Sequence, residues 1–152
     1  AIAAAGRGAH VVAIDVSQGL IDVARKRAPG HLSIDWRVGD MRNRDLGIFD
    51  HVVAMDSLIH YDLHDVMGVL YAWSARANEI AFTFAPSTTL LKIMHAAGKA
   101  FPRNDRSPAI KPIAENRLKQ EIHSEMTGWS VHFSQRVSSG FYKSQAMGIS
   151  RA

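Results

Sequence analysis

Short apolar runs alternate with amphipathic stretches in the first third of the chain. Residues 10–15 are rich in β-branched side chains and end in an acid, a pattern typical of a buried parallel strand. Ser17 can then cap a helix that extends to about Arg27, with Ile21 on its apolar stripe, before a Pro-Gly pair stops it. The next apolar run predicts a second strand over residues 32–38.

The same alternation continues through the middle of the chain. Residues 49–55 are predicted to form a third strand, and residues 56–61 the loop after it. Residues 79–84 predict a fourth strand, which Pro86 ends. A helix is expected between the third and fourth strands, because apolar residues recur there on one helical face: Val66, Leu70 and Trp73.

The stretch after the fourth strand is longer than a plain crossover needs. Residues 88–100 are predicted to be helical, residues 101–112 contain three prolines and read as a loop, and residues 113–124 are again predicted to be helical. Connections in compact α/β domains are usually shorter. We therefore expect residues 87–124 to form a substrate-binding insertion.

The chain closes on a predicted hairpin. Strands are expected at residues 129–136 and 141–149, joined by residues 137–140. Strand–helix alternation followed by a hairpin predicts an α/β fold with a doubly wound, mostly parallel sheet and a C-terminal antiparallel hairpin. No linker-like segment interrupts the pattern, so residues 1–152 are expected to form one domain.

Composition narrows the class of protein. Of 152 residues, 47% are hydrophobic and 21% are charged, as in folded globular domains, and no apolar run approaches the roughly 20 residues of a membrane-spanning helix. The absence of cysteine excludes disulfides, thiolate metal sites and a cysteine nucleophile. The net charge of +4 comes from basic residues outside any recognised nucleic-acid-binding module, so no nucleic-acid partner is expected.

Acids follow three of the predicted strands. In open α/β sheets, ligands bind beyond the carboxyl ends of the strands, where a carboxylate can accept hydrogen bonds from ribose hydroxyls or an adenine amine. One aspartate at a strand end is commonly a cap, but three in succession favour a nucleoside cofactor. The residues expected to bind it are Asp15, Val16, Asp40, Met41 and Asp56.

An acidic residue that binds the ribose does not discriminate between adenosylmethionine and a dinucleotide as the cofactor, because both classes of protein use one. The run Val-Gly-Asp-Met at residues 38–41 does, because it resembles the adenine-binding turn of class I methyltransferases. The terminal hairpin resembles their antiparallel strand. Three longer stretches are similar to a single family within this class: FDHVVAMDSLIHY (49–61), FTFAPSTTLLKIMHAAGKAFPRNDRSPAIKPI (82–113) and RVSSGFYKSQA (136–146). Together these stretches resemble the magnesium-protoporphyrin IX O-methyltransferase family from about Gly8 to the C-terminus.

This resemblance implies an enzyme of (bacterio)chlorophyll biosynthesis. It would transfer a methyl group from S-adenosyl-L-methionine to one propionate carboxyl of magnesium protoporphyrin IX, with magnesium present only as part of that substrate. The family also has a helical N-terminal segment, a first strand and a glycine-rich loop, none of which this sequence contains. We therefore expect the chain to begin just after that loop, with residues 1–6 as the end of the next helix, and to be inactive by itself.

Several residues are expected to act near the acceptor, and for His60 the resemblance supports the assignment. A propionate is already ionised at neutral pH, so its methylation needs alignment more than a base. His60 is expected to orient the carboxylate and Tyr61 to line the same pocket, against the alternatives of a surface or capping histidine and a core aromatic residue. Arg103 and Arg106 are expected to clamp substrate carboxylates, unless they belong to a solvated basic face. His60 and His64 have metal-pair spacing, but no third ligand accompanies them, so no protein metal site is expected.

Two other functions fit the same residues. Another small-molecule O-methyltransferase would share the acids but would not need the insertion. A non-catalytic adenosine-cofactor or pigment-binding module would not need the glycine loop. For the leading hypothesis, the expected partners are the tetrapyrrole and neighbouring enzymes of its pathway. The expected location is the cytoplasm, with at most peripheral association with photosynthetic membranes.

Overall fold

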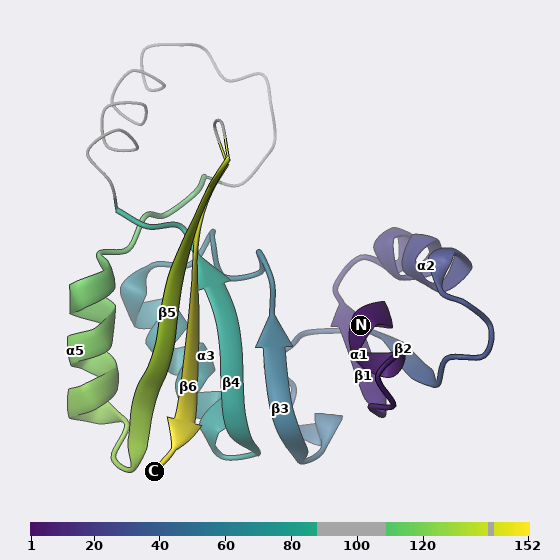
Figure 1. Cartoon of the computed structure of the whole chain (residues 1–152), viewed down its shortest axis with the longest axis horizontal. Helices are drawn as coiled ribbons and strands as arrows, with labels where there is room; N and C mark the ends of the chain where they lie inside the picture. The colour runs from purple at the N-terminus through teal and green to yellow at the C-terminus, as the bar shows by residue number, and fades with distance from the viewer. Residues whose placement is uncertain (88–108, 140–141) are drawn as a thin grey trace. The chain divides into compact units, whose positions relative to one another are not determined.

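The structure is a computed structural model that describes residues 1–87, 109–139 and 142–152. These residues fall into two compact units, Ala1–Leu46 and Gly47–Ala152, each with its own sheet (Figure 1). In the described ranges, no helix is long and apolar enough to cross a membrane. The helix predicted at residues 88–100 lies outside the described residues. The expectation of one domain over residues 1–152 stays a prediction.

The first unit is a strand–helix–strand arrangement, as the sequence predicted. β1 (Val11–Asp15) pairs in parallel with β2 (Ile34–Val38). Between them, α2 (Gln18–Arg27) begins after Ser17, whose hydroxyl oxygen accepts a hydrogen bond from the Leu20 backbone N–H at 3.3 Å. This contact confirms the expected helix cap. The unit also contains α1 (Ile2–Ala5) and η1 (Arg44–Leu46).

The second unit consists of β3 (Phe49–Ala54), α3 (Leu63–Ser74), β4 (Ala77–Phe84), α5 (Glu115–Glu125), β5 (Trp129–Ser139) and β6 (Tyr142–Arg151). Its sheet has the strand order β3-β4-β6-β5 (Figure 1). β3 and β4 run parallel, whereas β6 runs antiparallel to β4 and to β5. The α/β class with parallel strands and a C-terminal antiparallel hairpin is therefore confirmed.

The core of the second unit lies on one face of its sheet. α3 packs against β4, α5 packs against β5, and the two helices contact each other. Strand alternation directs every second side chain of β4 toward these helices. Each large apolar side chain buried there stabilises the unit by about 1.5–3 kcal/mol. The buried side chains include the predicted helix face, Val66, Leu70 and Trp73, together with Ile80, Phe82, Phe84, Leu118, Ile122, Met147 and Ile149.

The prediction that a helix begins at residue 113 is wrong. Ile113 has extended backbone and forms a parallel bridge with Pro86. Its N–H donates to the Ala85 carbonyl oxygen, and the Ser87 N–H donates to the Ile113 carbonyl oxygen, both at 2.8 Å. The helix begins two residues later, at Glu115. Tertiary pairing with the end of β4 therefore overrides the local apolar pattern.

Both strands of the closing hairpin are longer than predicted. β5 continues to Ser139 and β6 to Arg151, so that Val137 pairs with Ser144 instead of belonging to the connection. Serine and valine residues that suggested a turn thus take part in the ladder, because backbone pairing does not depend on side-chain polarity. β4 likewise begins at Ala77, two residues earlier than predicted.

A bulge in β5 brings two side chains over one position of β6. The pairing register shifts between Val131 and Phe133, and Gly148 lies opposite. A Cβ at Gly148 would overlap the Phe133 ring and come within 2.7 Å of His132 Nε2. Glycine is therefore required for this close packing.

Candidate functional site

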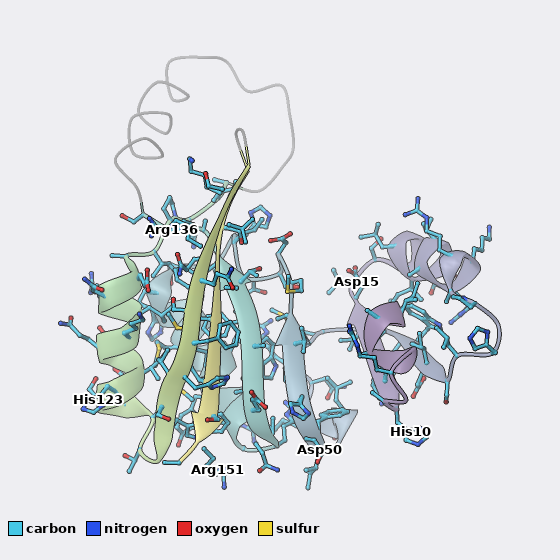
Figure 2. The ribbon with its side chains drawn as sticks, viewed as in Figure 1. His10, Asp15, Asp50, His123, Arg136 and Arg151 are labelled. Atoms are coloured by element: carbon cyan, nitrogen blue, oxygen red, sulfur yellow. The ribbon has the colours of Figure 1, made fainter. Side chains whose placement is uncertain are left out.

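Asp15 lies at the carboxyl end of β1, beside the end of β2 (Figure 2). The Gly39 N–H donates to the Asp15 carbonyl oxygen at 3.0 Å, which holds the two strand ends together. The Asp15 carboxylate accepts a hydrogen bond from the Ser17 backbone N–H at 2.8 Å. This contact orients the side chain and uses one of roughly four acceptor positions of a carboxylate.

Asp40 follows β2 and is held by Arg42. The Arg42 Nη2 donates to Asp40 Oδ2 at 2.7 Å, and the Arg42 backbone N–H donates to Oδ1 at 2.8 Å. The pKa of Asp40 is lowered to about 2, most strongly by the side-chain hydrogen bond from Arg42 and next by the backbone hydrogen bond from the same residue. Val16 and Met41 each follow one of the two acids, and Val16 is 77% exposed.

As predicted, all four residues lie at the carboxyl ends of β1 and β2: Asp15, Val16, Asp40 and Met41. Asp15 and Asp40 are acceptors that suit the hydroxyl and amine donors of an adenosine group. A low pKa keeps Asp40 ionised, so it accepts hydrogen bonds and does not donate them. The residues therefore fit an adenosine-containing cofactor such as S-adenosylmethionine, and their individual roles stay predictions. In the part of the chain that the structure covers, no three His, Cys, Asp or Glu side chains are arranged to hold a metal ion.

In the second unit, Asp56 is the second residue of the loop after β3 and has left-handed backbone. Its φ is 53°, a conformation that costs most non-glycine residues energy but that aspartate tolerates better than most. The Asp56 backbone N–H donates to Thr83 Oγ1 at 2.7 Å, and the Thr83 hydroxyl donates to Asp56 Oδ1 at 3.2 Å. The Asp56 carboxylate thus contacts β4, and its expected role in cofactor binding stays a prediction.

The same loop places His60 and Tyr61. Leu58 is fully buried and accepts a hydrogen bond from the Tyr61 backbone N–H at 3.1 Å. His60 Nδ1 lies 3.3 Å from the carbonyl oxygen of Ala109. Because a carbonyl oxygen only accepts hydrogen bonds, Nδ1 must carry the proton in this contact. The second ring nitrogen, Nε2, takes no part in it. The ring is therefore held by one edge.

Residues 109–113 run beside this loop and attach to it through Lys111. The Lys111 N–H donates to the Ile59 carbonyl oxygen at 2.9 Å, and its ammonium lies 3.1 Å from Asp62 Oδ2 and 3.8 Å from Asp65 Oδ2. Asp62 also caps α3 by accepting from the Asp65 backbone N–H at 3.0 Å. The pKa of Asp62 is lowered, most strongly by this backbone hydrogen bond and next by the hydrogen bond from Lys111.

Arg103 and Arg106, the predicted carboxylate clamps, lie outside the described residues. Two residues at the site escaped sequence reasoning, Thr83 and Lys111. Nothing in the sequence marks the Thr83 hydroxyl, and Lys111 stands out only as one of several basic residues. Their contacts depend on how the strands pair.

Arg136 on β5 lies toward the end of the sheet where β3 and β4 end (Figure 2). Its Nε donates to Gln145 Oε1 at 3.0 Å, and its Nη2 lies 3.7 Å from Glu115 Oε2. Hydrogen bonds from Lys119 and then Ser134 lower the pKa of Glu115. Arg136 therefore belongs to an ion-pair network that joins α5 to the hairpin.

Comparison with solved structures shows the fold. The chain superposes on the magnesium protoporphyrin IX methyltransferase of Synechocystis PCC 6803 with bound SAH at a TM-score of 0.83 and 23% identity, covering 99% of this chain and 68% of that one. The N-methyltransferase NodS of Bradyrhizobium japonicum gives a TM-score of 0.61 at 15% identity, covering 92% and 72% of the respective chains.

Sequence comparison is more specific. Over 146 residues, the chain is 43% identical to a magnesium-protoporphyrin O-methyltransferase of Rhodobacter capsulatus, covering 94% of this chain and 63% of that protein. It is 27% identical to a chloroplastic magnesium protoporphyrin IX methyltransferase of Arabidopsis thaliana, covering 93% and 46%. The chain thus spans less than two thirds of the length of these relatives.

Two family models match along the chain. One describes a methyltransferase domain and matches residues 1–77. The other describes the C-terminus of magnesium-protoporphyrin IX methyltransferase and matches residues 54–151, more than half of the chain. Because this model covers more than half of the chain, the chain belongs to the magnesium-protoporphyrin IX methyltransferase family.

Proposed function

We propose that this chain acts in an enzyme that transfers a methyl group from S-adenosyl-L-methionine to one propionate carboxyl of magnesium protoporphyrin IX, in (bacterio)chlorophyll biosynthesis. The 43% identity to the Rhodobacter capsulatus magnesium-protoporphyrin O-methyltransferase carries this proposal. The arrangement of polar groups supports it, because adenosine-type acceptors follow β1 and β2 and a histidine follows β3.

The acids of the first unit hold the cofactor in this proposal. Asp15 accepts hydrogen bonds from the ribose hydroxyls, and its contact with the Ser17 N–H fixes its carboxylate beforehand. Asp40 accepts from the adenine amine, with Met41 supplying a backbone N–H to the ring, and Val16 packs beside the ribose. When bound, the cofactor supplies an electrophilic methyl group.

The protein's task at the acceptor is alignment. A propionate has the ordinary carboxylic acid pKa of about 4 and is ionised at neutral pH, so no base has to remove a proton. The carboxylate must instead lose water and be held in line with the methyl group. A hydrogen-bond donor with a fixed orientation is suited to this task.

His60 can be that donor only in its protonated form. Its Nδ1 proton is directed at the Ala109 carbonyl oxygen, so a neutral ring presents Nε2 as an acceptor. An acceptor repels a carboxylate, whereas an imidazolium ring carries a second proton on Nε2 and attracts it. We therefore assign His60 the role of a cationic donor that orients the propionate without transferring a proton.

Tyr61, Arg103 and Arg106 complete the proposed acceptor site. Tyr61 follows His60 and lines the porphyrin pocket. Arg103 and Arg106 pair bidentately with the propionates, as guanidinium groups do with carboxylates. The protein works in the cytoplasm beside neighbouring enzymes of the pathway, with at most peripheral association with photosynthetic membranes.

A methyl-transfer assay tests the function. The complete protein is incubated with methyl-labelled S-adenosylmethionine and magnesium protoporphyrin IX, and the matched control is the dimethyl ester of the same porphyrin, which has no free carboxyl. Label should enter only the porphyrin with free propionates. Absence of label from that porphyrin would contradict the proposal. Label in another small molecule would favour a different O-methyltransferase, and cofactor binding without transfer to any acceptor would favour a binding module.

A further inference from the structure

The loop that carries His60 starts from a backbone that is costly to maintain. Asp56 has a φ of 53°, in the left-handed region that residues other than glycine adopt only at a cost in free energy. Such a conformation persists only where neighbouring groups hold it. One such group is on the adjacent parallel strand.

Thr83 holds Asp56 by two hydrogen bonds. Its hydroxyl oxygen accepts from the Asp56 backbone N–H at 2.7 Å, and its hydroxyl proton is donated to Asp56 Oδ1 at 3.2 Å. Thr83 is only 3% exposed, and the ladder between β3 and β4 fixes its position, with Ala54 opposite Phe82 just before it. The hydroxyl therefore contacts both the backbone and the side chain of Asp56.

We infer that Thr83 is a positioning residue for His60. Three residues separate Asp56 from His60, and the middle one, Leu58, is buried, so the backbone conformation at Asp56 influences where the histidine ring lies. Lys111 and Ala109 contact the later part of the loop, whereas Thr83 fixes its start. This inference rests on the proposed function, because the ring that Thr83 positions is the one assigned to orient the propionate.

Two pairs of substitutions separate the hydroxyl from the rest of the side chain. Thr83→Val keeps the shape and removes the hydroxyl, whereas Thr83→Ser keeps the hydroxyl and removes a methyl group. Thr83→Ala and Thr83→Ser differ by the hydroxyl alone, so this second pair serves if the valine variant does not fold. The complete protein is used for all variants.

The readouts are kcat, KM for each substrate and hydrogen exchange at the Asp56 amide. Thr83→Val should lower kcat about tenfold, with a smaller change in KM for S-adenosylmethionine, because both hydrogen bonds between the hydroxyl and Asp56 are lost. The Asp56 amide should exchange faster in this variant. Thr83→Ser should restore both kcat and exchange, and should exceed Thr83→Ala in kcat.

Other outcomes would overturn the inference. A valine variant with wild-type kcat and wild-type exchange at Asp56 would remove Thr83 from this role. Equal losses in the serine and alanine variants would assign the effect to packing of the methyl group. If the wild-type protein transfers no methyl to the porphyrin, the proposed function fails, and exchange at Asp56 still tests the contact itself.

Discussion

His60 is held by its Nδ1 edge against the Ala109 carbonyl oxygen at 3.3 Å. If its other edge donates to the propionate, His60→Ala should lower kcat by about 10- to 150-fold, the equivalent of one charged hydrogen bond. Cofactor affinity should change less, because the interaction acts on the acceptor. His64→Ala is the matched control, since His64 is an exposed histidine four residues away, and steady-state kinetics should show it close to wild type.

Asp15 is argued to accept hydrogen bonds from the cofactor ribose. Asp15→Ala should weaken S-adenosylmethionine binding by about 1.5–3 kcal/mol, the usual value for hydrogen bonds to a charged group. Calorimetry on the complete protein measures this, with Asp22→Ala as the control, because Asp22 is an aspartate on α2 that contacts Gln18 and Arg25. Equal affinities in the two variants would place Asp15 outside the cofactor site.

The positions of single residues could be predicted from the sequence where these residues lie at the end of a strand. Asp15 and Asp40 share an edge because their strands are adjacent and parallel, which the apolar pattern already implied. Thr83 was missed because its partner Asp56 is 27 positions away in sequence, and only the pairing of β3 with β4 brings them together. A hydroxyl on a buried strand gives no such signal by itself.

At the scale of elements, the bulge in β5 makes one glycine of β6 essential. Gly148→Ala would place a methyl group into the Phe133 ring, so we expect a loss of about 1–3 kcal/mol in the free energy of unfolding. Gly68→Ala should have the opposite sign, with a gain of about 0.5–1 kcal/mol, because Gly68 lies within α3 and a Cβ there meets nothing within 4 Å. Chemical denaturation of the complete protein compares the two. Equal effects would show that the bulge repacks freely.

The network between α5 and the hairpin should depend on pH. Contacts with Lys119 and Ser134 lower the pKa of Glu115 below its ordinary value of 4.5, so the unfolded state binds its proton more readily. The stabilisation is therefore present above that value and is lost as the pH falls through the lower pKa of the folded state. Glu115→Gln should melt at a lower temperature than wild type at neutral pH, and this difference should shrink in acid. Glu125→Gln, at the exposed end of α5, should show no such trend.

Elements were predictable where side-chain periodicity decides burial. The buried face of α3 was predicted correctly from the sequence, and β4 was predicted correctly apart from its first two residues. The start of α5 was not, because Ile113 is taken up by backbone pairing with the end of β4. The length of the hairpin was also underestimated, since Val137 and its neighbours form a ladder that turn-like composition does not reveal.

At the scale of the whole molecule, the order of strands and helices is that of a methyltransferase fold, which agrees with the family of the chain. Among the described residues, β1 pairs with β2 and β3 pairs with β4, and each pair ends in polar residues that the proposed reaction needs. The α/β class with a closing hairpin could be expected from alternation, whereas the acceptor could not, because no spacing of residues specifies a tetrapyrrole. That assignment came from three extended stretches of similarity, which the family model over residues 54–151 and the 43% identical relative support.

The central claim is carboxyl methylation of magnesium protoporphyrin IX, and identification of the reaction product by mass spectrometry tests it most directly. The complete protein is incubated with S-adenosylmethionine and the porphyrin, next to the Rhodobacter capsulatus relative as the positive control. We predict the monomethyl ester of magnesium protoporphyrin as the product of both proteins. Formation of the ester by the relative alone under identical conditions would contradict the account.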